Sequence, residues 1–330
     1  MIPSRMTKKI FPIFKKYKNV RVLVTGADGF MGSHLTERLL ELGALVTVFV
    51  RGTSTSGTRR GLKNIAHIAD KVKVIAGNIA SQDSIDLIAK AKPEIIFHLA
   101  AEAYVPKSFT QPLDVFAVNL NGTLNVLEAG RKIDGLRRIV TTSSGEVYGS
   151  YSGSISENNL LNPTSPYGAS KVAADRAAYS WFVTYGLPVS IIRPFNTYGP
   201  RHTYDVIPKF IDLALAGKSL TVHGTGKQSR DFTYVSDTVN GFLLMGIHPK
   251  AVGEVVNFGA GTATSIDKIA KAITKLTGSK VDIIYDGARL AEVARLTCNW
   301  GKAKKLFGWS PQVNLNEGLA LNIQWSKENR

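Results

Sequence analysis

The chain has 330 residues, of which 44% are hydrophobic and 20% are charged, and its net charge is +16. This composition is typical of a globular protein with one large hydrophobic core and a second, smaller one. The single cysteine, Cys298, excludes an internal disulfide framework and favours a reducing compartment, the cytoplasm. The basic residues are spread along the chain, which argues against a dedicated nucleic-acid arm, so no nucleic-acid partner is expected.

Residues 1–18 form a basic leader, in which lysines and aromatic residues interleave between Lys8 and Lys18. We expect this leader to be solvated and partly disordered, with contact to a membrane surface as the alternative. No apolar run approaches the roughly 20 residues that span a bilayer, and no signal-peptide pattern is present.

From residue 19 to 193, short apolar runs alternate with helical patterns. The expected strands are Val20–Thr25, Ala44–Val50, Val72–Ala76, Glu94–Leu99, Arg138–Thr142 and Val189–Ile192, and the expected helices include Phe30–Leu42, Gln111–Arg131 and Pro166–Tyr185. Continuous apolar strands that alternate with helices predict an α/β fold with a doubly wound parallel sheet, covered by helices on both faces.

After residue 193 the rhythm changes, and glycine and proline become frequent up to residue 226. The expected helices are Asp237–Gly246, with Asp237 near its N-cap, Ser265–Leu276, Lys302–Phe307 and Leu315–Ser326, and the expected strands are Glu254–Phe258 and Val281–Tyr285. We expect residues 234–258 to return to the first sheet. Segments 194–233 and 259–330 then predict a smaller α/β domain that binds the substrate.

A glycine-rich turn links the first strand to the first helix. Gly26, Gly29 and Gly32 have the spacing G-x-x-G-x-x-G, with Phe30 and Met31 inside the same turn. Glycines let the backbone approach a pyrophosphate closely, and the N-terminus of the helix offers unpaired N–H groups. The turn therefore predicts a dinucleotide site in a Rossmann-type domain.

The residues after the second strand indicate which dinucleotide binds. A carboxylate at this point would bind the ribose 2′-hydroxyl of NAD, whereas an arginine suits the 2′-phosphate of NADP. No carboxylate is present, and Arg51 follows the strand directly, with Arg59 and Arg60 further on. We therefore expect NADP in preference to NAD.

Tyr167 and Lys171 lie four residues apart at the start of an expected helix, and so share one face. A free tyrosine has a pKa of about 10 and is a poor base at neutral pH. A cation beside it stabilises the phenolate and lowers that pKa. The pair can then exchange a proton with a sugar or alcohol hydroxyl.

Several ordered motifs resemble one known family from Val20 to Trp309. They are TGADGFMGSH from Thr25, HLAA from His98, TSSGEVYG from Thr142, SPYGASK from Ser165, RPFNTYGPR from Arg193 and RDFTYV from Arg230. The chain resembles the extended short-chain dehydrogenase/reductases of the NAD-dependent epimerase/dehydratase group, which modify nucleotide sugars. The resemblance implies a homodimer, formed through the helices Gln111–Arg131 and Pro166–Tyr185.

The same resemblance implies roles for single residues. Tyr167 would be the acid/base, Lys171 would lower its pKa and hold the nicotinamide ribose, and Ser144 would bind the reacting hydroxyl. The other implied residues are Leu99, Ala100, Ala101, Asn78 and Ile79 beside the cofactor, and Asn196, Arg230 and Arg289 at the nucleotide diphosphate, with Arg295 as the rival of Arg289. Asn78 stands where the family usually has an acidic residue. His98 is expected to be structural, and no metal site is expected.

Glu146 decides which reaction follows. A 4-keto group, formed by oxidation at sugar C4, acidifies the C5 hydrogen, and a carboxylate at this position could remove it and help to expel water from C6. The leading hypothesis is therefore a nucleotide-sugar 4,6-dehydratase. A 4-epimerase, a 4-keto-6-deoxy-sugar reductase and a UDP-glucuronate decarboxylase are the alternatives within the family. From another class, the charge of +16 suggests a non-catalytic dinucleotide-binding protein that binds RNA.

Overall fold

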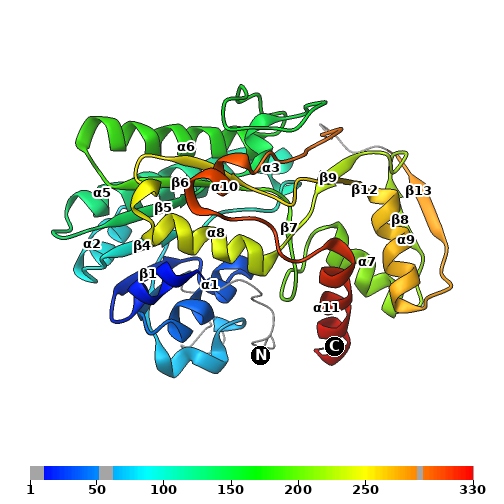
Figure 1. Cartoon of the computed structure of the whole chain (residues 1–330), viewed down its shortest axis with the longest axis horizontal. Coiled ribbons are helices and arrows are strands. Elements are labelled where there is room, and N and C mark those ends of the chain that lie inside the picture. The colour runs from blue at the N-terminus through cyan, green and yellow to red at the C-terminus, as the bar shows by residue number, and fades with distance from the viewer. Residues whose placement is uncertain (1–10, 52–61, 288–292, 330) are drawn as a thin grey trace.

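The computed structural model describes residues 11–51, 62–287 and 293–329. Within these residues the centre is a seven-stranded sheet of order β11-β6-β5-β4-β1-β2-β3, in which all neighbours are parallel (Figure 1). Its strands are β1 (Arg21–Thr25), β2 (Leu45–Val50), β3 (Lys73–Ala76), β4 (Ile95–His98), β5 (Arg138–Thr142), β6 (Val189–Pro194) and β11 (Val255–Phe258). The order runs outward from β1 in both directions, so the predicted doubly wound Rossmann-type fold is confirmed.

Helices cover both faces of this sheet (Figure 1). One face carries α2 (Asp83–Lys90), α5 (Gly122–Arg131) and α6 (Pro166–Tyr185), and the other carries α1 (Phe30–Glu41) and α8 (Val235–Ile247). Strands covered on both sides must be apolar throughout, and the four residues of β4 are all buried. The two faces hold separate hydrophobic clusters, so the sheet is the wall between two cores.

The helix expected at Gln111–Arg131 is interrupted. It consists of α4 (Pro112–Phe116), a π-helical turn at Ala117–Asn121 and α5, and the short α3 (Lys107–Thr110) precedes it. Such π turns occur mostly as single insertions in α-helices, often at functional sites.

The second part of the molecule is built from α7 (Val206–Leu215), α9 (Ile266–Thr277), α10 (Gly301–Phe307) and α11 (Leu315–Glu328). The described residues here also form three two-stranded sheets: β7 (Thr197–Tyr198) with β10 (Thr233–Tyr234), β9 (Ser229–Asp231) with β12 (Ala263–Ser265), and β8 (Leu220–His223) with β13 (Ile283–Asp286). The strand expected at Val281–Tyr285 therefore begins two residues later. β11 returns to the main sheet beside β6. The division into two domains stays a prediction.

The prediction of a solvated leader is wrong for its described part. Residues Pro12–Tyr17 form a 3-10 helix, in which Phe14 and Tyr17 are buried. The Tyr17 hydroxyl donates a 2.7 Å hydrogen bond to the carbonyl of Leu243 on α8. The aromatic residues of this segment pack on the core, and its lysines remain outside.

Asp237 does not cap α8, as had been expected. The helix begins two residues earlier, at Val235, and has no side-chain cap. The Asp237 carboxylate instead accepts the backbone N–H groups of Gln312 at 2.9 Å and Val313 at 3.0 Å. It thereby fixes the chain between α10 and α11. No helix in the described part of the chain is long and apolar enough to cross a membrane.

Candidate active site

The glycine turn brings the start of α1 against the loop after β4. Gly26 has a φ of +69°, and a side chain on it would lie 2.7 Å from the backbone nitrogen of Ala100. A Cβ on Gly32 would lie 2.1 Å from the carbonyl oxygen of Gly26. The N-cap of α1 is Gly29, which has no side-chain hydrogen bond to the first turn. This cradle of bare backbone at a helix N-terminus fits the pyrophosphate of a dinucleotide.

The other residues expected at the cofactor lie at the same edge of the sheet. Thr25, at the end of β1, accepts a 3.1 Å hydrogen bond from the N–H of Ala100. Asn78 follows β3, and its Oδ1 accepts the N–H of Ala80 at 3.1 Å, while Ile79 is buried. Since neighbouring parallel strands end at one edge, the Leu99–Ala101 loop, Asn78 and the glycine turn come together.

Arg51 is exposed and stands directly after β2. Burial raises the pKa of Asp28 in the glycine turn, and the positive charge of Arg51 lowers it in part. Arg51 therefore lies near enough to the turn to act on its charge. Arg59 and Arg60 lie outside the described residues.

Ser144 and Tyr167 meet because two chain segments pack closely. Ser144 follows β5 and caps the 3-10 helix Gly145–Tyr148, where its Oγ accepts the N–H of Glu146 at 3.1 Å. A Cβ on Gly168, in the first turn of α6, would lie 3.0 Å from the carbonyl oxygen of Glu146. This close approach brings the Tyr167 hydroxyl into a hydrogen bond with Ser144.

The pKa of Tyr167 moves in the opposite direction to the one expected from its spacing to Lys171. Burial raises it, a hydrogen bond with Ser144 opposes the rise, and the negative charges of Glu146 and Asp205 add to it. The Lys171 ammonium donates a 2.9 Å hydrogen bond to the carbonyl of Thr142. Burial lowers the pKa of Lys171 itself to about 8, with Asp175 opposing.

Glu146 is a carboxyl group inside this site. Burial raises its pKa, the positive charge of Arg230 lowers it, and Asp205 raises it further. Its charge also acts on Tyr167. Glu146 is therefore closer to its neutral form than an exposed glutamate, and it can both take and return a proton.

The residues expected at the substrate lie on the second part of the molecule. Asn196 follows β6, and its carbonyl accepts the N–H of Thr233 at 2.9 Å. Arg230 lies on β9, where its guanidinium donates to the carbonyls of Ser229 and Val293. The backbone of Arg295 pairs with Ser229 beside the same strand. Arg289 lies outside the described residues.

Three residues near the reactive group were not expected from the sequence. Asp205 and Tyr204 lie in the loop before α7, where the charge of Asp205 raises the pKa of Tyr167 and Tyr167 acts electrostatically on Tyr204. Asn119, in the π turn, donates a 2.9 Å hydrogen bond to Ser170 Oγ on α6 and accepts the N–H of Glu102 at 2.8 Å. A helical pattern gives no sign of a π turn, so spacing alone could not identify Asn119.

His98 is buried in β4, as expected for a structural residue. Its Nδ1 lies 2.8 Å from Thr25 Oγ1, and its Nε2 lies 3.1 Å from Thr123 Oγ1. Burial lowers its pKa to about 3. No group of three or more His, Cys, Asp or Glu residues that could hold a metal occurs among the described residues.

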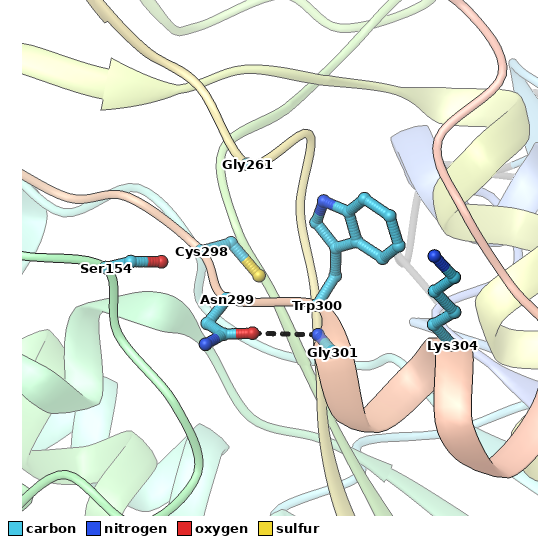
Figure 2. A pocket seen from close by; sticks show the side chains of 7 residues that line it. All are labelled: Ser154, Gly261, Cys298, Asn299, Trp300, Gly301 and Lys304. Atoms are coloured by element: carbon cyan, nitrogen blue, oxygen red, sulfur yellow. Dashed lines mark hydrogen bonds between the residues drawn. The ribbon is translucent and has the colours of Figure 1, made fainter.

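A separate pocket opens at the start of α10 (Figure 2). Trp300 and Lys304 form one wall, with the ammonium 5.7 Å from the ring centroid, and Asn299 Oδ1 accepts the N–H of Gly301 at 2.9 Å. None of the residues expected at the cofactor or substrate lines this pocket. It is therefore not the place where Ser144 and Tyr167 meet.

Comparison with known proteins places this geometry in a family. The family model described as GDP-mannose 4,6 dehydratase matches residues 23–321. The UDP-glucose 4-epimerase of Mycolicibacterium smegmatis is 36% identical over 312 residues, which cover 93% of this chain and 98% of the relative. The dTDP-D-glucose 4,6-dehydratase of Bos taurus is 33% identical over 322 residues, covering 94% and 89%.

A solved structure agrees with these relatives. The UDP-glucuronic acid 4-epimerase from Bacillus cereus, in complex with UDP-glucuronic acid and NAD, has a TM-score of 0.87 at 29% identity, covering 94% of this chain and all of that one. Fold and site thus define a dinucleotide-binding enzyme of the extended short-chain dehydrogenase/reductase class. The chain belongs to its family of NAD-dependent nucleotide-sugar 4,6-dehydratases, epimerases and decarboxylases.

Proposed function

We propose that the chain is a nucleotide-sugar 4,6-dehydratase. The observation that carries the proposal is Glu146, a carboxyl group with a raised pKa beside Tyr167. Oxidation at C4 needs only Ser144, Tyr167 and Lys171 with the cofactor. A further acid/base group in the same site is accounted for by the elimination that follows in a dehydratase.

Each proton then has a defined donor and acceptor. Bound NAD(P), held at the glycine turn and by Lys171, supplies hydride acceptance and return. The Tyr167 phenolate, which the Lys171 cation stabilises in this proposal, takes the proton of the C4 hydroxyl, which Ser144 orients. The resulting 4-keto group acidifies C5, and Glu146 takes the C5 proton and delivers it to the C6 oxygen, which leaves as water. C6 then takes back the hydride and C5 takes the proton held by Tyr167, which gives the 4-keto-6-deoxy sugar nucleotide.

The nucleotide diphosphate is assigned to the second part of the molecule. We propose that Asn196 and Arg230 hold it, since a guanidinium fork can bind two phosphate oxygens at once. Arg289 is proposed for the same role from the family resemblance.

Mass spectrometry of the products tests the proposal. The purified protein is incubated with UDP-, GDP-, dTDP- and CDP-hexoses, and we expect loss of one water from the accepted substrate. Glu146→Gln should abolish this loss while sparing cofactor binding, and Glu41→Gln, at an exposed position on α1, is the matched control. Full elimination by Glu146→Gln would refute the role of this carboxyl.

A 4-epimerase is the second candidate, and one observation favours it. A Cβ on Gly145 would lie 3.1 Å from the Phe195 ring, so the position between Ser144 and Glu146 has little room for another acidic side chain. The relative in Mycolicibacterium smegmatis also carries the name of an epimerase. For this candidate, the substrate mass is unchanged and Glu146→Gln retains turnover.

We propose NADP as the preferred cofactor, although solved neighbours hold NAD. The support is Arg51, whose charge lies near the glycine turn and suits a 2′-phosphate. Titration with both cofactors tests this preference. Arg51→Ser should weaken NADP binding roughly tenfold, the loss of one charge-assisted contact, and leave NAD binding unchanged. Tighter binding of NAD by the unaltered protein would contradict the preference.

We also propose a cytoplasmic homodimer. Its interface would use α6 and the helix before it, where Leu113 is 83%, Val183 61% and Tyr185 50% exposed. An apolar surface of this kind on two adjacent helices suits a self-complementary contact. Mass measurement in solution should give twice the chain mass, and Val183→Glu should give monomers. A monomeric unaltered protein would contradict the proposal.

A further inference from the structure

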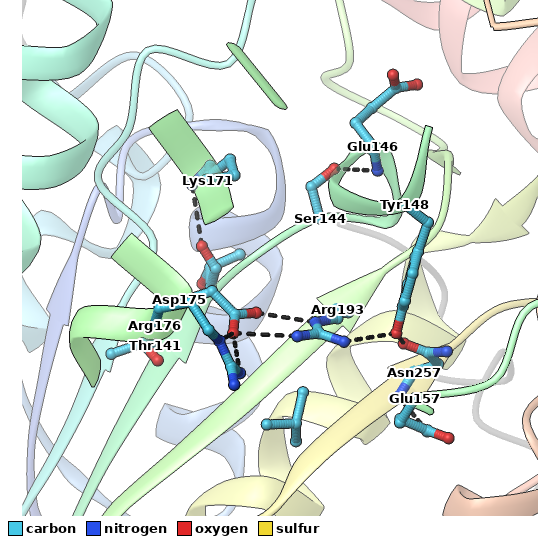
Figure 3. A network of polar contacts seen from close by, with 12 residues as sticks. Thr141, Ser144, Glu146, Tyr148, Glu157, Lys171, Asp175, Arg176, Arg193 and Asn257 are labelled. Atoms are coloured by element: carbon cyan, nitrogen blue, oxygen red, sulfur yellow. Dashed lines mark hydrogen bonds and ion pairs between the residues drawn. The ribbon is translucent and has the colours of Figure 1, made fainter. Parts of the chain in front are cut away.

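A buried ion pair lies directly behind Lys171. Asp175 follows Lys171 by one helical turn on the same face of α6, and both side chains are buried. The Asp175 carboxylate accepts two hydrogen bonds from Arg193 on β6, at 2.8 Å from Nε and 3.0 Å from Nη2 (Figure 3). The side chain of Arg193 is only 3% exposed.

This pair continues into the segment that carries Ser144. Arg193 Nη1 donates to the Tyr148 hydroxyl at 2.6 Å, and that hydroxyl donates to Asn257 Oδ1 at 2.8 Å (Figure 3). Tyr148 ends the 3-10 helix that begins directly after Ser144. Side-chain hydrogen bonds therefore connect the helix of Tyr167 and Lys171 to the turn of Ser144 and Glu146.

The charges in this region depend on Asp175. Lys171 and Arg193 are two buried cations, and Asp175 is the buried carboxylate that acts on both. The other groups around Lys171 give it no negative charge: His98 on β4 has a pKa near 3 and is neutral, and Thr142 on β5 offers a carbonyl. Burial raises the pKa of Tyr167, on the same helix, and so disfavours its phenolate.

We propose that Asp175 is a positioning residue, which keeps the Lys171 ammonium charged and holds α6 against the Ser144 turn through Arg193 and Tyr148. The inference rests on the proposed role of Lys171. It concerns the proton transfer at C4, a step shared by dehydratase and epimerase. It therefore does not depend on which of these reactions follows.

The pH dependence of kcat tests the inference. Lys171 acts as a cation, so activity falls as pH rises through its pKa, which burial places at about 8. Asp175→Asn removes the negative charge that opposes the lowering of the Lys171 pKa. The alkaline limb of the pH profile of kcat should therefore move to a pH that is lower by about one unit. Asp175→Glu keeps the charge and should restore the limb. An unmoved limb in folded Asp175→Asn would overturn the proposal.

A surface variant decides the question even if Asp175→Asn does not fold. Arg176 is 44% exposed and also donates to the Asp175 carboxylate. Arg176→Gln removes a cation that competes with Lys171 for the Asp175 carboxylate. The alkaline limb of the pH profile of kcat should therefore move up by a few tenths of a pH unit. Tyr148→Phe removes no charge, and should lower kcat without moving the limb. An unmoved limb in Arg176→Gln would contradict the inference.

These measurements use the full chain and the nucleotide sugar that the unaltered protein turns over in the panel above. Absence of turnover with every nucleotide sugar would count against the proposed function. If the protein turns a nucleotide sugar over but the alkaline limb is the same in the Asp175 and Arg176 variants as in the unaltered protein, the inference alone is contradicted.

Discussion

The glycine turn and the β9 region both hold loops in close contact, but by different means. At the turn, side chains are missing, and a methyl group on Gly32 would lie 2.1 Å from the Gly26 carbonyl. At β9, the buried carboxylate of Asp231 accepts the N–H groups of Ala260 at 2.6 Å, Gly261 at 2.8 Å and Cys298 at 2.9 Å. The first arrangement is local in sequence, whereas the second joins segments far apart, so only the first can be recognised from spacing.

Among changes in and around these two regions, the loss of Tyr167 should have the largest effect. Tyr167→Phe removes the acid/base, so kcat should fall by roughly 100- to 10,000-fold, while cofactor affinity stays the same. Tyr179→Phe, on the exposed side of the same helix, is the matched control. Steady-state kinetics and cofactor titration give the two values. Nearly full activity of Tyr167→Phe would contradict the assignment.

Acid should destabilise the cofactor region. Burial lowers the pKa of both His34 and His98 to about 3, below the ordinary value of 6.5. The stability from their neutral forms is therefore present above pH 6.5 and is lost as pH falls towards 3, by roughly 2 kcal/mol per histidine at pH 5.

Denaturant unfolding between pH 5 and pH 7 measures this loss. His98→Asn should make the dependence shallower, and the exposed His67→Asn should leave it unchanged. Equal slopes in His98→Asn and the unaltered protein would contradict the prediction.

Adding one methyl group to the glycine turn tests its tight packing. Gly32→Ala should lower cofactor affinity roughly tenfold and stability by about 1–3 kcal/mol, because the Gly26 carbonyl must move. Gly287→Ala is the control, since a Cβ there meets nothing within 4 Å. Isothermal titration measures the affinity. Unchanged cofactor binding by Gly32→Ala would show that the close contact is not needed.

A change in the β9 region should weaken the binding of the substrate and leave the binding of the cofactor unaffected. Asp231→Asn cannot accept all three backbone N–H groups, so KM for the nucleotide sugar should rise roughly tenfold, with cofactor affinity unchanged. Asp282→Asn, exposed in the same half, is the control. A change in cofactor affinity as large as the change in KM would remove the distinction between the two regions.

Local patterns accounted for most of the fold. Strands buried on both faces read as apolar runs, and the glycine turn and the Tyr167–Lys171 spacing are short-range features. The two- and three-residue strands β7, β9, β10 and β12 carry no periodic signal and were not expected. The leader was misread because its lysines conceal the buried face of Phe14 and Tyr17.

Only part of the site could be predicted from the sequence, because burial and long-range contacts depend on how the chain packs. The family resemblance predicted that Ser144 and Tyr167 act on the same hydroxyl, but the direction of a pKa shift depends on burial, which spacing does not give. The Asp175–Arg193 pair joins α6 to the strand β6 against which it packs, and neither residue is distinctive alone. A contact between two separate elements, such as this ion pair, is visible only once the elements are packed in the structure.

Glu146 carries the central claim, and the product of the unaltered enzyme tests it most directly. After incubation with the nucleotide-sugar panel, mass spectrometry should find a product lighter than its substrate by one water. A product of unchanged mass would contradict the claim and assign the chain to the epimerases.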